Sequence, residues 1–203
     1  MTAKALFEQL KHPNHNLRSR AMREIADTRD ENTIPHLMGL LEEEDMTYRR
    51  SAVKTLGVIG LDAVPSLVDE LKNSENATIR ASCTKALAQV AVNHPDDPFP
   101  ELGLQALKTA LGDLNPVVHI ASAMALGAVG SAALDILVEA VQTTENVAVA
   151  VAVVNAIGSI PEEKATKTLT ELANDESIDS YVRESANSAL SRLQLMQQNS
   201  VRE

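Results

Sequence analysis

The feature that most constrains this chain is a short phrase that recurs six times at a nearly fixed interval. In each copy an apolar residue precedes a recurring position, here named the ladder position, and an aliphatic anchor follows seven residues later. The ladder positions are spaced by 31, 31, 39, 31 and 33 residues and are Arg18, Arg49, Arg80, His119, Ala150 and Arg183. The anchors are Ile25, Leu56, Leu87, Leu126, Ile157 and Leu190. A period in this range is typical of a solenoid of stacked supersecondary units.

Each unit predicts a pair of helices, named A and B in chain order. The B helices contain the phrase and are expected at 14–25, 47–58, 76–90, 115–129, 146–157 and 180–193. The A helices are expected at 3–11, 34–41, 64–72, 101–111, 132–141 and 162–173. Five of the B helices begin at a side chain that can cap the unpaired N–H groups of the first turn. These capping residues are Asn14, Asn76, Asn115, Asn146 and Ser180. The fold class predicted is all-α, an α–α superhelix of about six helix pairs.

A repeat that runs from end to end predicts one array over residues 1–193 rather than two domains. The third spacing is eight residues longer than its neighbours, and the surplus lies at residues 93–100, which contain three prolines. Proline interrupts a helix, so a loop insertion is expected there. Residues 194–203 are expected to form a C-terminal helix extension or a frayed tail.

Composition excludes several classes of function. The net charge is −10, which disfavours binding to a phosphate backbone, so no nucleic-acid partner is expected. The chain has one cysteine, Cys83, and no membrane-spanning or signal segment is expected, which predicts a cytoplasmic protein. Its four aromatic residues leave the core to aliphatic side chains and alanine, which suits closely packed helices.

Two segments, 48–65 and 115–130, resemble HEAT repeats of the phycobilisome-lyase-like type, and the resemblance covers almost the whole chain. Within that family the chain is most similar to a cyanobacterial HEAT protein that interacts with the IscA iron–sulfur carrier. This resemblance implies a non-enzymatic adaptor that binds an IscA-like protein and carries no cofactor. The alternative is a phycobilin lyase, chromophore-handling or phycobilisome-degradation subunit that acts on phycobiliproteins, together with a second HEAT subunit in the lyase case.

The family resemblance also implies that the ladder residues Arg18, Arg49, Arg80, His119 and Arg183 are structural, and that they bind carbonyl or acidic groups of an adjacent turn. The alternative is a row of anion-binding groups.

Partner binding is expected along two rows of the B helices, which line the concave surface in HEAT solenoids. The first row lies one residue after each ladder position and the second row lies five residues after it. Both rows are basic in the first three units and apolar in the fourth and fifth. The predicted partner-binding residues are Arg23, Arg50, Lys54, Lys85, Ile120, Met124, Val151 and Asn155. The alternative is an ordinary solvated face followed by extra packing between repeats.

Candidates for catalysis or metal binding are weak. Cys83 lies among small core positions, which favours a buried, inert thiol over a nucleophile. His12 and His15 are three residues apart but lack nearby Cys or carboxylate ligands, and His94 forms a second weak cluster with Asp96 and Asp97. No catalytic residue and no metal site are therefore predicted.

Overall fold

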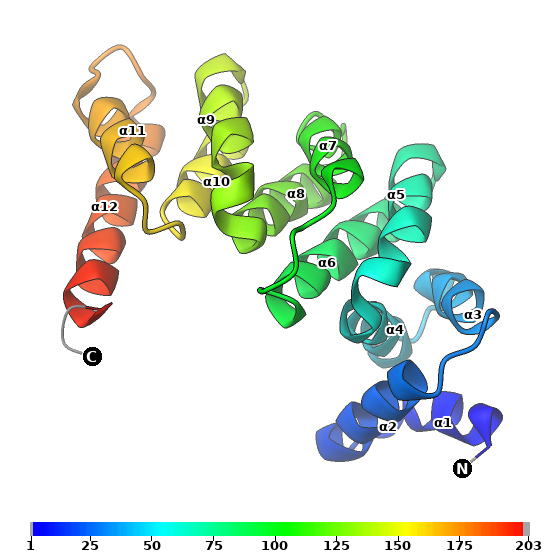
Figure 1. Cartoon of the computed structure of the whole chain (residues 1–203). Helices are drawn as coiled ribbons and strands as arrows, with labels where there is room; N and C mark the ends of the chain where they lie inside the picture. The colour runs from blue at the N-terminus through cyan, green and yellow to red at the C-terminus, as the bar shows by residue number, and fades with distance from the viewer. Residues whose placement is uncertain (1, 201–203) are drawn as a thin grey trace. The chain divides into compact units, whose positions relative to one another are not determined.

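The computed structural model describes residues 2–200, with the side chains of residues 2–196. Over residues 2–200 the chain forms twelve α-helices and three short 3₁₀ helices, and no strand (Figure 1). The A helices are α1 (Ala3–Gln9), α3 (Thr33–Gly39), α5 (Val64–Asn73), α7 (Glu101–Ala110), α9 (Leu134–Thr143) and α11 (Glu163–Asn174). The B helices are α2 (His15–Asp27), α4 (Met46–Ile59), α6 (Ala77–Asn93), α8 (Pro116–Val129), α10 (Val147–Ile157) and α12 (Ser180–Ser200). The 3₁₀ helices are η1 (Leu40–Glu42), η2 (Gly60–Ala63) and η3 (Gly130–Ala133). The predicted all-α fold of about six helix pairs is confirmed.

The predicted caps are found at four of the B helices. Asn14, Asn76, Asn115 and Asn146 each accept a hydrogen bond from a backbone N–H in the first turn. The cap expected at Ser180 is one residue too late, because Asp179 Oδ1 accepts from the Tyr181 N–H at 2.8 Å. At α4 the cap is Asp45, whose Oδ1 lies 2.7 Å from the Thr47 nitrogen. An aspartate accepts such a hydrogen bond as well as an asparagine does, so Asp45 and Asp179 cap their helices in the same way.

The chain divides into two compact units, Met1–Ala106 and Leu107–Glu203, and the boundary falls within α7. In unit 1 the B helices pack in sequence, α2 on α4 and α4 on α6, while α1 and α5 pack on α2 and α6. In unit 2 α8 packs on α10 and α10 on α12, while α9 and α11 pack on α10 and α12. Each unit is therefore built around a layer of adjacent B helices. A single continuous array over residues 1–193 remains a prediction.

The recurring phrase places its apolar positions in the core. Five of the six anchors are buried, with Leu56, Leu87, Leu126 and Ile157 at 0% exposed, while Leu190 is half-buried. The small residues three positions after the ladder are also buried, among them Ala21, Cys83 and Ser122. Small side chains at these positions allow neighbouring helices to approach closely.

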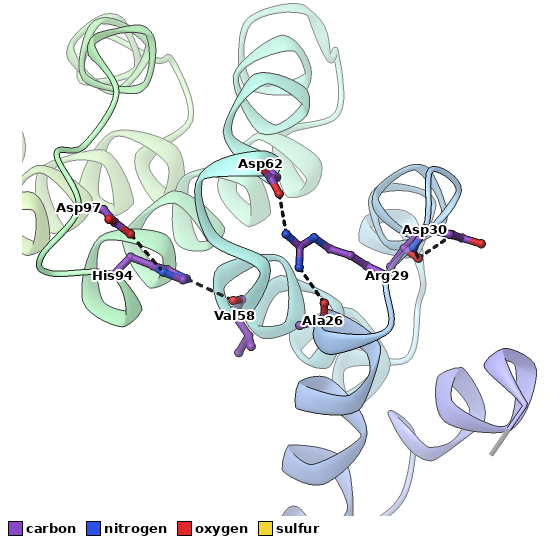
Figure 2. Close-up of polar contacts among 8 residues, drawn as sticks. Ala26, Arg29, Asp30, Val58, Asp62, His94 and Asp97 are labelled. Carbon is purple, nitrogen blue, oxygen red and sulfur yellow. Dashed lines mark hydrogen bonds and ion pairs between the residues drawn. The ribbon is translucent and has the colours of Figure 1, made fainter.

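The loop of the insertion covers residues 94–100, because Asn93 is still the last residue of α6, and it folds against the end of α4. Figure 2 shows the His94 ring there, with Nε2 lying 3.2 Å from the Val58 carbonyl oxygen and Nδ1 lying 3.7 Å from an Asp97 carboxylate oxygen. In the same unit Arg29 joins two repeats, because its guanidinium lies 2.8 Å from Asp62 Oδ2 and donates to the Ala26 carbonyl at 3.0 Å (Figure 2). The insertion is thus fixed on unit 1 by its histidine.

Two segments, Met46–Asn73 and Pro116–Thr143, are long and apolar enough by composition to cross a membrane. Each one turns at a glycine with positive φ, Gly60 at 85° and Gly130 at 78°, so each is a B helix followed by the next A helix. In their most apolar windows, 67% and 50% of the residues are buried within the protein. They are weak indications of a membrane span, since packing between repeats already accounts for their apolar character.

Truncation of an anchor in either unit should destabilise that unit. Leu56→Ala and Leu126→Ala should each lower the free energy of unfolding by about 2–5 kcal/mol, because both side chains are fully buried and leave a cavity. Urea unfolding followed by circular dichroism measures the effect. Lys54→Ala, on the exposed side of α4, is the control and should change stability by less than about 0.5 kcal/mol. Equal midpoints for Leu56→Ala and Lys54→Ala would show that the register assigned to α4 is incorrect.

Candidate functional site

The ladder positions lie in the first turn of each B helix, where the preceding A helix ends. The side chains of Arg18, Arg49, Arg80 and His119 all reach the carbonyl oxygen six residues earlier in the chain. Arg18 Nη1 donates to His12 at 2.6 Å and to Pro13 at 2.8 Å, and Arg80 Nη1 donates to Ser74 at 3.0 Å and to Glu75 at 3.1 Å. Arg49 donates to the Glu43 carbonyl, and His119 Nδ1 lies 3.2 Å from that of Asp113. These side chains thereby pair backbone groups that the helix ends leave open.

The last two ladder positions differ. Ala150 has no donor in its side chain. Arg183 is half-buried, and among the described residues its Nε has no hydrogen-bond partner, although its charge acts on Asp175. The ladder side chains are therefore hydrogen-bonded within the chain in the first four repeats, and the fifth repeat has no such bond.

The second row is exposed in all six repeats. In unit 1 it presents the cations Arg23, Lys54 and Lys85 on successive B helices, and Arg50 of the first row is exposed beside them. The first row is less uniform, because Ala81 is only 4% exposed and belongs to the core. Ala81 therefore adds nothing to the exposed surface, because its methyl group is small enough to be covered by neighbouring helices. Unit 1 thus carries a basic surface on its B helices, which we name the basic surface and define by Arg23, Arg50, Lys54 and Lys85.

In unit 2 the same face is hollowed. A groove of about 890 Å³ runs over α8, α10 and α12, and we name it the apolar groove. Of the predicted residues Ile120, Val151 and Asn155 line it, while Met124 is 66% exposed on α8 but is not among its lining residues. The Asn155 side chain is held by two bonds, since its Nδ2 donates to the Val151 carbonyl at 2.9 Å and its Oδ1 accepts from Arg192 at 2.8 Å. The groove volume lies within the usual range of ligand sites.

Sequence reasoning missed Tyr181 as a member of this groove, and it placed Glu184 in the first row without predicting that it binds a partner. Tyr181 lies two residues before its ladder position and is 71% exposed, and Glu184 lies one residue after it. Positions two before, one after and five after the ladder are three and four residues apart, so they share one helix face. That spacing is the signal that could have placed Tyr181 in the groove. Tyr48 is not a surface aromatic, because it is 4% exposed and lies under the Lys11 ammonium, 4.3 Å from its ring centroid.

Cys83 lies on α6 with 0% of its surface exposed. Burial, with a smaller contribution from the negative charge of Glu70, raises the pKa of its thiol to about 12. The thiolate is the nucleophilic form of cysteine, so this side chain is neutral and shielded near neutral pH. Among the described residues no group of three or more His, Cys, Asp or Glu side chains could hold a metal ion.

The family follows from the sequence comparison. The family model described as "HEAT repeats" matches residues 3–88 and 104–191 of this chain. This chain belongs to the HEAT-repeat family.

Named relatives of this HEAT-repeat protein come from cyanobacteria. It is 54% identical over 196 residues to the "uncharacterized phycocyanin operon protein Z" of Pseudanabaena tenuis, which covers 97% of both chains. It is 36% identical over 167 residues to the "bilin biosynthesis protein CpeZ" of a Synechococcus species, which covers 79% of this chain and 89% of the relative. Its fold is similar to the complex of CpcE and CpcF of phycocyanin lyase from a Nostoc species, with a TM-score of 0.50 and 17% identity over 76% of this chain and 96% of that one.

These relatives correct one prediction. An adaptor for an IscA-like iron–sulfur carrier is wrong as the main interpretation, because the relatives are named for bilin biosynthesis and the phycocyanin operon. The repeat pattern is set by core positions, which are shared by HEAT proteins with different partners, so the pattern favoured the wrong member of the family. The HEAT-repeat part of the resemblance is confirmed, and the relatives named for the phycocyanin operon and for bilin biosynthesis agree with its phycobilisome-related part.

The thiol of Cys83 should be inert in the folded protein. At pH 8 a disulfide reagent such as 5,5′-dithiobis(2-nitrobenzoic acid) should react slowly, because the raised pKa disfavours the thiolate and burial blocks access. In urea the pKa should return to about 8.5 and the reaction should become fast. Cys83→Ala is the control for background absorbance. Rapid labelling of the folded chain would instead identify an accessible, reactive thiol.

Removal of a ladder arginine should cost stability. Arg80→Ala should lower the free energy of unfolding by about 1.5–3 kcal/mol, because two carbonyl oxygens lose a charged donor. Lys85→Ala, which removes an exposed cation from the same helix, is the matched control and should be nearly neutral. Equal unfolding midpoints in urea for the two variants would mean that the ladder bond contributes nothing to folding.

Proposed function

We propose that this chain is a bilin-lyase or chromophore-handling subunit that acts on phycobiliproteins in the cytoplasm. The observation that carries the proposal is the 36% identity, across 79% of the chain, to a protein named for bilin biosynthesis. The 54% identity to a phycocyanin operon protein supports the same assignment. Together they connect this chain to the making of phycobiliproteins rather than to iron–sulfur transfer.

The apolar groove supports this function by its chemistry. A bilin is a long conjugated tetrapyrrole with propionate groups, so its site should offer apolar and aromatic surface together with cations. Ile120 and Val151 give the groove aliphatic walls, and Tyr181 gives it an exposed aromatic ring. The Arg192 guanidinium lies at its edge on Asn155, whereas Glu184 opposes an anion, so we expect a propionate to bind toward Arg192.

The basic surface of unit 1 supports recognition of an acidic protein partner. Its four cations lie on three successive B helices. This concentration of positive charge is unusual for a chain whose net charge is −10. Positive surfaces of this kind steer an oppositely charged partner and raise the rate of association. We propose a phycobiliprotein as that partner, and a second HEAT-repeat subunit as a further one.

The chain contributes binding in this proposal rather than a covalent nucleophile. Cys83 is buried and neutral, so it does not serve as a transient acceptor of the bilin. The reacting groups would then belong to the bilin, the phycobiliprotein or a second subunit, and this chain would hold and orient them.

Titration of free phycocyanobilin or phycoerythrobilin into the purified chain, with and without an apo-phycobiliprotein subunit, tests the function. We expect a change in the bilin absorbance band on binding, or comigration of the chain with the apo-subunit on gel filtration. Val151→Glu should abolish the absorbance change, because it places a charge in the apolar groove. Thr170→Glu, on the exposed side of α11, is the control and should behave as wild type. The proposed function would be rejected if the absorbance did not change and the chain did not comigrate with the apo-subunit.

Charge reversal on the basic surface should slow association with the apo-phycobiliprotein. Arg50→Glu combined with Lys54→Glu should lower the association rate, and added salt should weaken wild-type binding in the same way. The control is Lys4→Glu combined with Lys72→Glu, which changes the net charge equally but on A helices. Equal slowing in both pairs, measured by surface plasmon resonance, would show that net charge alone controls association.

A further inference from the structure

Unit 2 contains a second cleft, which shares Val147 with the apolar groove. It has a volume of about 560 Å³ and lies where α9 ends and α10 begins, against the end of α11 and the start of α12. Ala150 lines it, together with Thr144 and Glu145. Ala150 is the ladder position of the fifth repeat, and Thr144 and Glu145 lie six and five residues before it.

In other repeats an arginine guanidinium fills the corresponding place. Arg18 donates to the carbonyl oxygens six and five residues earlier, and Arg80 does the same. In the fifth unit the corresponding carbonyls belong to Thr144 and Glu145, and Ala150 has no side chain that could donate to them. The cleft is therefore a ladder position without its guanidinium.

The charge around the cleft is suited to a cation. Its lining includes the carboxylates of Glu145, Glu171, Asp175 and Asp179, and none of the described residues that line it is basic. Thr144 and Asp175 are the C-caps of α9 and α11, so the partial negative charge of two helix ends adds to theirs. Hydrogen bonds from Ser177 lower the pKa of Asp175 and keep it ionised, and Arg183 is the nearby cation that offsets part of this charge.

We propose that the cleft at Ala150 binds the guanidinium of an arginine side chain from a partner polypeptide, in the place that Arg18 and Arg80 fill in their own units. A guanidinium suits this place because the guanidinium groups of Arg18 and Arg80 each donate to two carbonyl oxygens through Nη1 alone. Its remaining N–H groups, more than an ammonium would have left, can donate to the carboxylates of the cleft. Val147, Leu172 and Val182 line the same cleft and would pack against the aliphatic stem. This site is independent of the proposed bilin function.

The probe for the test is Nα-acetyl-arginine methylamide, titrated into isotopically labelled protein at constant ionic strength. We expect saturable shifts of the Ala150 methyl resonance and of the Thr144 and Glu145 amides. The citrulline derivative, which has the same shape without the charge, should cause no saturable shift, and the lysine derivative should bind at least tenfold more weakly. Binding of either control as tightly as the arginine probe, or no saturable shift at Ala150, would overturn the proposal.

Two variants complete the test. Ala150→Arg should abolish probe binding and raise the melting temperature, because its own guanidinium would fill the cleft and donate to the carbonyls of Thr144 and Glu145. Glu145→Gln combined with Glu171→Gln changes only exposed side chains, so it should fold normally and bind the probe about tenfold more weakly. Thr170→Gln, also exposed on α11, is the control and should leave affinity unchanged. Unchanged affinity in the double variant would overturn the proposal even if Ala150→Arg failed to fold.

Discussion

The close approach of consecutive B helices is the constraint on which each unit depends. A Cβ atom on Gly57 would lie 2.3 Å from Gln89 Cβ, and one on Gly158 would lie 2.6 Å from Ala189 Cβ. Gly127 meets Ala156 in the same way, at 3.1 Å. These glycines lie eight residues after their ladder positions, so the second, fourth and fifth repeats each bring a bare backbone to the next B helix. The B helices can therefore form a dense layer without large side chains, which agrees with a chain that has four aromatic residues.

Because the core is made by short aliphatic side chains, the outer face of the B layer is free to vary. In unit 1 it carries exposed cations, and in unit 2 it is hollowed into the apolar groove. The same helix positions produce both surfaces, so the difference lies in the side chains and not in the backbone. A repeat protein can in this way change what it binds without changing how it folds.

The sequence predicted the helix pairs, a loop after α6 and the burial of five of the six anchors, since all three depend on local periodicity and on proline. It did not predict the cap at Asp179, because several polar residues precede α12 and only the backbone decides which of them accepts. It also missed Tyr181, because the rows were counted forward from the ladder and the face extends one turn backward. The partner was predicted least well, because core positions shared by many HEAT proteins carry little information about what the surface binds.

The alanine at position 150 also bears on how the second unit comes apart. In a linear array, stability is approximately the sum of what each repeat contributes and what adjacent repeats add. The fifth repeat lacks the tie that Arg18, Arg80 and, in the same unit, His119 supply to theirs, so we expect its helices α9 and α10 to be less stable than the fourth repeat. We therefore expect local opening there, with amide protons that exchange with solvent earlier than those of the fourth repeat. Anything that fills the gap would tighten the repeat and make the second unit unfold more cooperatively.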